Sequence, residues 1–218
     1  MLKRTGEKTS VIRELPPFTK IYLKDNVNVF ITQGNLQEVK VEGGENLIPL
    51  VKTEVINGEL HIDNDNKCNW SRSYKKGTLT VYVTIPSLRY ISHHGSGKIS
   101  SNGIISCDTL DILTNESGDV ELWLNAHVVF NHLGTTSDVT LHGTSSLMGI
   151  YHTGEGYLHC EDLETDFTWS YSKASGNEYL NAKQSLALTI DWEGDVYYSG
   201  NPAASVKGTG NGKLIRLN

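Results

Sequence analysis

Carboxylates recur at matching places in this 218-residue sequence. Asp119 and Asp138 are 19 residues apart, and Asp195 lies further along the same pattern. If the spacing marks stacked strands about 4.8 Å apart, such carboxylates repel one another unless a proton or a cation lies between them. We expect solvated aspartates at turn exits, where Asp is locally favoured, with a weak Ca²⁺ column as the alternative and no other cofactor. The run from Glu161 to Asp166 receives the same two interpretations.

The spacing of histidine and cysteine, the usual zinc ligands, does not indicate a zinc site. His132 and His152 are 20 residues apart, which would stack two imidazoles, but no third ligand is evident and we expect no metal site. Three cysteines are too few for a disulfide framework, and none forms a CxxC pair. We expect Cys160 to be a small buried hydrophobic residue.

Aromatic residues concentrate in the C-terminal part of the chain. Such rings either fill a core and cap its end or stack on sugar rings and anchor protein interfaces. Trp169 fits either role. The candidate ligand-binding residues are Trp169, Tyr171, Tyr179, Trp192 and Tyr197.

An enzyme that acts on polysaccharide needs either a basic residue near a carboxylate-held Ca²⁺ or two to three carboxylates facing one groove. The chain has five arginines, and none lies between residues 90 and 215. This disfavours a lyase that binds and deprotonates a uronate along that stretch. No catalytic residue is assigned, and a hydrolase with an unrecognised carboxylate pair stays open as an alternative.

Charge and composition exclude further classes. The net charge is −6, and no basic run exceeds Lys75-Lys76, which argues against nucleic acid and anionic membranes as partners. No stretch approaches the roughly 20 apolar residues of a transmembrane segment. Residues 1–8 contain no apolar signal core, so the protein is either cytoplasmic or an exported protein whose leader has been replaced by Met. The abundance of Gly, Ser, Thr and Asn favours export to the periplasm, outer membrane or cell surface.

A repeat of about 19 residues organises the chain. A turn of small residues is followed, after one residue, by a position that is apolar in six of seven cases; these positions are 99, 120, 139, 158, 178, 196 and 214. A coil of three short strands and three turns uses about 20 residues, and stacked coils pair each strand with its equivalent above. The sequence therefore predicts an all-β fold, a right-handed parallel β-helix of about seven coils.

Alternation within each coil predicts which side chains face inward. The predicted inward pairs are Val120/Leu122, Val139/Leu141, Leu158/Cys160 and Val196/Tyr198. Each coil has a second apolar stretch: Leu88/Ile91, Leu110/Ile112, Val128/Phe130, Leu147/Ile150, Phe167/Trp169 and Leu186/Leu188/Ile190. Glu178 occupies a position that is otherwise apolar, and we expect a local bulge that turns it outward, or else a ligand site at the coil edge.

The N-terminal third is β-rich but less regular. Phe18, Ile21 and Val29 repeat the spacing of Leu88, Ile91 and Ile99, so the chain is expected to begin with a coil-like unit. Asn57-Gly58 predicts a hairpin turn, and Asp63 to Lys76 a polar loop. The predicted organisation is a tail (residues 1–10), a β-rich portion continuous with the solenoid (11–86) and the parallel β-helix (87–218).

The order of motifs along the chain is more specific than any one of them. The motifs are Arg13-Glu-Leu-Pro-Pro-Phe18-x-x-Ile21-x-Leu23, Val27-x-Val29-x-Ile31-x-Gln33-Gly34, Val39-x-Val41-x-Gly43, Gly58-x-Leu60-x-Ile62 and Val83-x-Ile85-Pro86-x-Leu88-x-x-Ile91-x-x-x-Gly95-Ser-Gly97. This order resembles the auto-transporter adhesin, head GIN domain family of Bacteroidetes-type bacteria over roughly residues 11 to 217. His93-His94 before Gly95, and Asp138 without a preceding Gly, depart from the usual Gly-Ser-Gly turn.

The resemblance implies an exported or lipid-anchored envelope protein with β-helical architecture and no established enzyme activity. It carries no catalytic motif. The leading hypothesis is a non-enzymatic binding or adhesion-type domain whose partner is a glycan or a cell-surface protein. The alternatives are a carbohydrate-active enzyme and a structural module that self-associates through an exposed strand or an uncapped end.

Overall fold

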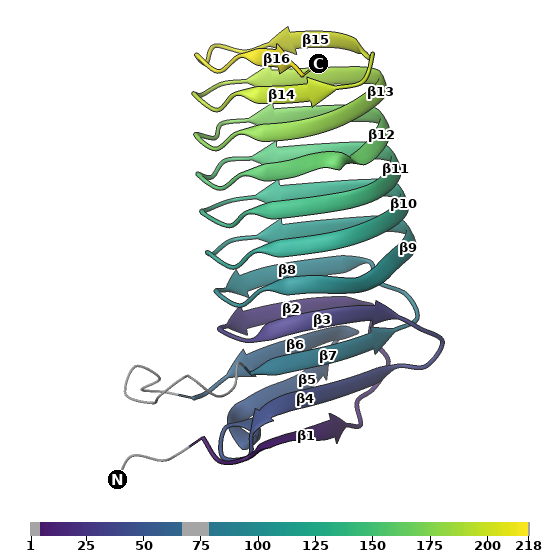
Figure 1. Cartoon of the computed structure of the whole chain (residues 1–218), viewed down its shortest axis with the longest axis vertical. Coiled ribbons are helices and arrows are strands. Elements are labelled where there is room, and N and C mark those ends of the chain that lie inside the picture. Colours follow the sequence, from purple (N-terminus) through teal and green to yellow (C-terminus); the bar gives the residue numbers. More distant parts are fainter. Residues whose placement is uncertain (1–4, 67–78, 218) are drawn as a thin grey trace.

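The protein is an all-β parallel solenoid of about seven turns, as the sequence predicts (Figure 1). The structure is a computed structural model and describes residues 5–66 and 79–217. Within this range the 16 strands belong to one continuous sheet that winds along the molecule. The predicted polar loop from Asp63 to Lys76 lies mostly outside the described residues.

The first coil of the chain lies between two coils that follow it in sequence. Its strands β2 and β3 pair in parallel with β6 and β7 on one side. On the other side they pair in parallel with β8 and with β9 (Ile99–Thr114). This register places Ile21 beside Ile91 and Val29 beside Ile99, which confirms the coil-like unit. The bounds are β2 Lys20–Asp25, β3 Asn28–Gln33, β6 Glu59–Asn64, β7 Thr80–Ile85 and β8 Tyr90–Gly95.

Antiparallel strands close this end of the solenoid (Figure 1). They are β1 (Lys8–Arg13), β4 (Glu38–Gly44) and β5 (Val51–Ile56), with a short 3₁₀ helix, η1 (Ile48–Leu50), before β5. Asn57 and Gly58 join β5 to β6 with φ of +52° and +76°, as a type I′ hairpin turn requires, so the predicted turn is confirmed. Residues 8–10 of the predicted tail belong to β1.

Five long strands build the middle of the solenoid, each covering two sides of a coil. Strand β13 shows this directly, because β14 pairs with its first part and β15 with its second. The five long strands are β9 Ile99–Thr114, β10 Val120–Leu133, β11 Val139–His152, β12 Leu158–Ser172 and β13 Glu178–Ile190. Three short strands follow them: β14 Val196–Ser199, β15 Ala203–Lys207 and β16 Leu214–Arg216.

The seven repeat positions form one interior column in perfect register. Val120 pairs with Val139, Val139 with Leu158, and the column continues through Glu178 to Val196 and Leu214. The side chains of Val120, Val139, Leu158 and Val196 are at most 1% exposed. Their partners at i+2 (Leu122, Leu141, Cys160) are equally buried, and Tyr198 packs partly buried against this core. The predicted inward set is confirmed.

The expectation that Glu178 turns outward at a bulge is wrong. Glu178 pairs with Leu158 and Val196 without a register shift, and its exposed fraction is 0%. The carboxyl group therefore points into the core of the solenoid, among aliphatic neighbours in its own column.

The second apolar stretch is only partly interior. In β10 the inward positions are Leu124 and Ala126 before the corner but Val129 and Asn131 after it, so the alternation changes phase by one residue. The same change in β11 and β12 leaves Met148, Ile150, Thr168 and Ser170 inside. As a result Val128, Phe130, Leu147, Phe167 and Trp169 lie on the outer side of their coils, and of the two roles open to Trp169 the structure shows an exposed ring.

Candidate functional site

An exposed aromatic surface covers the second halves of β10 to β12. Because parallel pairing aligns equivalent residues, their outward rings stand in columns along the solenoid. Phe167, Trp169 and Tyr151 are 46%, 41% and 44% exposed. The rings of Tyr151 and Tyr171 stack with centroids 5.4 Å apart and an interplanar angle of 14°. We call Phe130, Tyr151, Phe167, Trp169 and Tyr171 the aromatic face.

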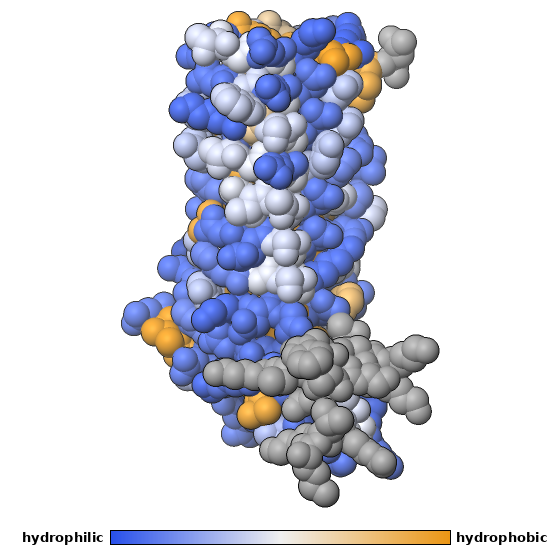
Figure 2. Space-filling view, turned by 90° about the vertical axis from the view of Figure 1, so that its left-hand side faces the viewer, coloured by the Kyte–Doolittle hydropathy of each residue, from blue (hydrophilic) through white to orange (hydrophobic). Residues whose placement is uncertain are grey.

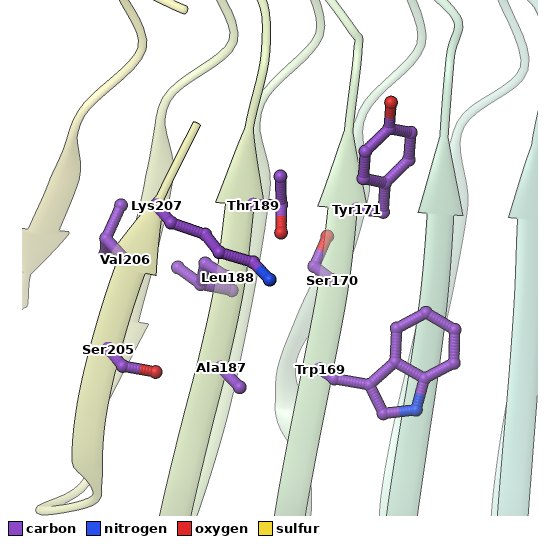
Figure 3. A pocket seen from close by; sticks show the side chains of 9 residues that line it. All are labelled: Trp169, Ser170, Tyr171, Ala187, Leu188, Thr189, Ser205, Val206 and Lys207. Atoms are coloured by element: carbon purple, nitrogen blue, oxygen red, sulfur yellow. The ribbon is translucent and has the colours of Figure 1, made fainter. Parts of the chain in front are cut away.

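Gly149 lets the Trp169 indole lie close to the sheet. Gly149 occupies the ladder position between Phe130 and Trp169. A Cβ atom there would be 2.5 Å from Cζ2 of Trp169 and 2.7 Å from Cδ1 of Phe130, closer than atoms pack. The indole consequently lies over Gly149. Figure 3 shows it extending from β12 away from β13. A flat exposed indole of this kind is suited to stacking on a planar or ring-shaped ligand.

A groove borders the aromatic face toward the C-terminal end. It has a volume of about 330 Å³ and lies over β12, β13 and β15 (Figure 3). Ala187 and Thr189 provide short side chains on β13, between Trp169 and Tyr171 on β12 and Ser205 and Lys207 on β15. We call this the terminal groove; Ser170, Leu188 and Val206 complete its lining.

The remaining predicted aromatic residues lie elsewhere. Tyr179 and Tyr197 stack on one another with centroids 5.0 Å apart and continue onto His159, also at 5.0 Å, along the first halves of the strands. Trp192 is 55% exposed and follows β13 in the turn toward β14. Figure 2 shows this edge of turns as a mostly hydrophilic surface with a band of intermediate hydropathy along its middle. The structure thus divides the five predicted residues among three places.

The predicted carboxylate column has backbone partners. Asp119 Oδ1 accepts a hydrogen bond from the N–H of Asp138 (3.1 Å), and Asp138 Oδ1 accepts one from the N–H of Tyr157 (2.8 Å). Asp195 Oδ1 likewise accepts from the N–H of Lys213, one coil further on (2.8 Å). Asn177 fills the same role with its amide oxygen toward Asp195 (2.9 Å). These side chains therefore connect successive coils through the backbone, and a Ca²⁺ column stays a prediction.

Asp138→Asn is expected to keep the stability of the protein, whereas Asp138→Ala lowers it by about 1 kcal/mol. The reason is that an amide oxygen accepts the same N–H bond, while alanine leaves that N–H without it. Urea unfolding of both variants measures this. Adding Ca²⁺ tests the alternative, because a cation column predicts a Ca²⁺-dependent rise in Tm that Asp138→Asn removes.

The other side chains considered as metal ligands, two histidines and the carboxylates of residues 161–166, do not meet at one site. His132 lies on the outer side, 3.5 Å from a carboxylate oxygen of Asp111, while His152 is completely buried, so the expected stacked pair is absent. The carboxylates of the 161–166 run contact separate partners, among them Lys183 for Glu164 (2.5 Å). Within residues 5–66 and 79–217, no three His, Cys, Asp or Glu side chains are grouped to hold a metal ion.

A buried polar cluster lies inside the solenoid. Glu178 Oε1 contacts Nδ1 of His152 at 3.3 Å and accepts a hydrogen bond from the hydroxyl of Ser170 at 3.0 Å. A hydrolytic triad places histidine between the hydroxyl and the carboxylate, so that the imidazole takes the proton of the nucleophile. Here the glutamate is in the middle, and all three residues are at most 3% exposed. The three groups are in the wrong order for that chemistry, and their burial keeps a substrate from reaching them.

The family assignment follows from the same repeat. The family described as "putative auto-transporter adhesin, head GIN domain" matches residues 17–202. The chain belongs to this family. No curated protein matches the sequence. The aromatic face lies inside the matched segment, whereas Ser205 and Lys207 of the terminal groove lie beyond it.

Solved structures share the fold of this head GIN domain over nearly its whole length. A putative adhesin from Bacteroides fragilis is 22% identical, with a TM-score of 0.89 and 97% of each chain covered. A putative lipid binding protein from Parabacteroides distasonis is 18% identical, with a TM-score of 0.76 and 98% of each chain covered. A putative adhesin from Parabacteroides merdae is 14% identical, with a TM-score of 0.71, and covers 100% of this chain and 99% of its own.

Membership assigns this head GIN domain to adhesion-type domains of the bacterial surface or envelope. The described residues contain no helix with the length and apolar character needed to cross a membrane. Sequence reasoning named Trp169 and Tyr171 as candidates but did not name Gly149, Ala187, Thr189 or Lys207. The available signal was their spacing from the aromatic residues, which is one coil step for Gly149, Ala187 and Thr189 and two for Lys207. This spacing becomes informative only once the register is known.

Proposed function

We propose that the protein is a non-enzymatic adhesion-type domain that binds glycans through its aromatic face and terminal groove. The observation that carries this proposal is the exposed Trp169 indole beside a groove with a short-chain floor. Pyranose rings present an apolar C–H face that stacks on aromatic rings, while hydroxyl groups such as those of Thr189 and Ser205 suit the polar edge of a sugar.

An exported location fits this proposal, because a glycan-binding surface meets its ligand outside the cytoplasm. We place the domain in the periplasm, at the outer membrane or on the cell surface. A lipid ligand, as named for one structural neighbour, is less well supported. The interior of the coils is filled by side chains such as Leu141, Leu158 and Leu186 at 0% exposure, which leaves no room for an acyl chain there.

Replacing Trp169 by alanine is expected to weaken glycan binding by roughly 10- to 100-fold, because a central stacking residue contributes about 1.5–3 kcal/mol. Binding is first identified on a glycan array with the intact chain and then measured by titration calorimetry. Trp192→Ala is the matched control, because Trp192 is also an exposed tryptophan but lies outside the terminal groove. It is expected to bind as the wild type does.

Three further measurements separate the rival sites and functions. Tyr179→Ala tests the second aromatic surface: if it removes binding while Trp169→Ala does not, our site is wrong. A reducing-sugar assay on each bound glycan tests for an enzyme, and release of product would overturn the non-enzymatic proposal. Absence of any glycan ligand on the array, together with concentration-dependent light scattering, would favour the self-associating module instead.

A further inference from the structure

The side chains that line the terminal groove carry a positive charge and no negative one. None of its nine lining residues is acidic, and Lys207 is basic, in a chain whose net charge is −6. Ala187, Thr189 and Ser205 are too short to shield the Lys207 amino group from a ligand on the groove floor. The groove therefore combines an aromatic wall, formed by Trp169 and Tyr171, with a single positive charge at Lys207.

Lys207 is directed across the groove rather than along the strand. Lys207 pairs with Thr189, which in turn pairs with Tyr171, so these three residues lie on one line across β15, β13 and β12. In Figure 3 the Lys207 side chain extends from β15 over β13, and its amino group points toward the β12 side. No carboxylate lies within 4 Å of its Nζ among the residues that the structure describes.

A second lysine borders the aromatic wall. Nζ of Lys173 lies 5.5 Å from the centroid of the Tyr171 ring. Its pKa is raised, first by a hydrogen bond with the Tyr171 side chain and further by the charge of Asp191. The nearby carboxylate of Asp191 also accepts a hydrogen bond from the N–H of Thr209 at 3.1 Å. Lys173 thus keeps its charge beside Tyr171, and Lys207 is the cation within the groove itself.

We infer that the terminal groove binds anionic sugars, with a ring stacked beside Trp169 and Tyr171 and its carboxylate or sulfate held by Lys207. This inference rests on the proposed glycan binding and adds the class of ligand. An ammonium group is a compact charge that attracts either anion, and the aromatic wall positions the ring without selecting its charge. Lys207 is therefore the residue that separates acidic from neutral sugars.

The test compares three ligands built on galactose: oligogalacturonate, a sulfated galacto-oligosaccharide and the neutral galacto-oligosaccharide. The wild type is expected to bind at least one acidic ligand about 10-fold more tightly than the neutral one, and increasing NaCl should reduce this preference. Binding that favours the carboxylate over the sulfate, or the reverse, identifies the anion. If the neutral ligand binds as tightly as both acidic ones, the inference is wrong although glycan binding stands.

Lys207→Gln is expected to weaken binding of the acidic ligand about 5- to 10-fold and leave neutral sugars unaffected. Lys213→Gln, in the same final coil but outside the groove, is the matched control and should behave as the wild type. Trp169→Ala, in contrast, weakens acidic and neutral ligands alike. Failure to bind any acidic glycan overturns the inference; failure to bind any glycan at all overturns the proposed function with it.

Discussion

Replacing Glu178 by Val and His152 by Leu together is expected to leave the protein as stable as the wild type or more stable, whereas each single replacement costs about 3 kcal/mol. Val and Leu are residues that other coils place in these columns, at Val196 and Leu133. A single replacement leaves a buried ionisable group without its partner, whereas the double replacement removes both ionisable groups and leaves only the neutral Ser170 hydroxyl of the cluster.

Urea unfolding of the wild type, both single variants and the double variant gives this coupling as a double-mutant cycle. Glu178 Oε2 and His152 Nε2 already lack a hydrogen-bond partner, so the cluster includes two unsatisfied polar atoms before any change. Leu158→Val, in the same column, reports the cost of a simple cavity. If the two single effects add, with a coupling below about 1 kcal/mol, then the His152–Glu178 contact does not determine the stability of these coils.

A second large effect is expected from pH, through His93. Its side chain is 0% exposed, and burial lowers its pKa from 6.5 to about 4. This value also includes a smaller lowering by His94 and the opposite effect of the Gly97 and Gly118 backbone and of the Asp119 charge. The folded protein therefore holds this imidazole neutral over a pH range in which the unfolded chain protonates it.

The free energy of unfolding should fall between pH 6.5 and pH 4, because the unfolded state then binds the additional proton. The contribution is complete above pH 6.5, and its loss amounts to about 3 kcal/mol by pH 4. Tm of the wild type and of His93→Leu, measured across this range, isolates the effect, since Leu23 occupies the same column. His132→Gln, an exposed histidine, is the control. An unchanged pH profile in His93→Leu would contradict the assignment.

The buried His152 and the exposed aromatic rings have a common structural origin. At each corner of β10, β11 and β12, the chain uses one additional residue, which reverses the side to which every later side chain points. After the corner, polar residues such as Asn131 and Ser170 face inward, and Phe130 and Trp169 face outward. The surface that we propose for binding therefore exists because the interior accepts polar residues in those coils.

Most of the architecture could be predicted from the sequence. The repeat positions, the period and the small residues of the turns are local features, and one turn per coil is enough to align Val120, Val139, Leu158 and Val196 in register. The Asn57-Gly58 turn and the coil formed around Ile21 and Val29 could be predicted equally well, because each is recognised from residues close together in the chain.

The location of the corner within each coil could not be predicted from the sequence. Hydrophobicity alone leaves Trp169 open between the core and the surface, and only the position of the bend between Thr165 and Thr168 directs Phe167 and Trp169 to solvent. The same holds for Lys207, whose place across from Tyr171 depends on two successive strand pairings. The sequence by itself determined the stacking of the coils, because that follows from a repeated local pattern. The tertiary structure decided which side chains meet the solvent, because a shift of one residue at a corner reverses every side chain after it.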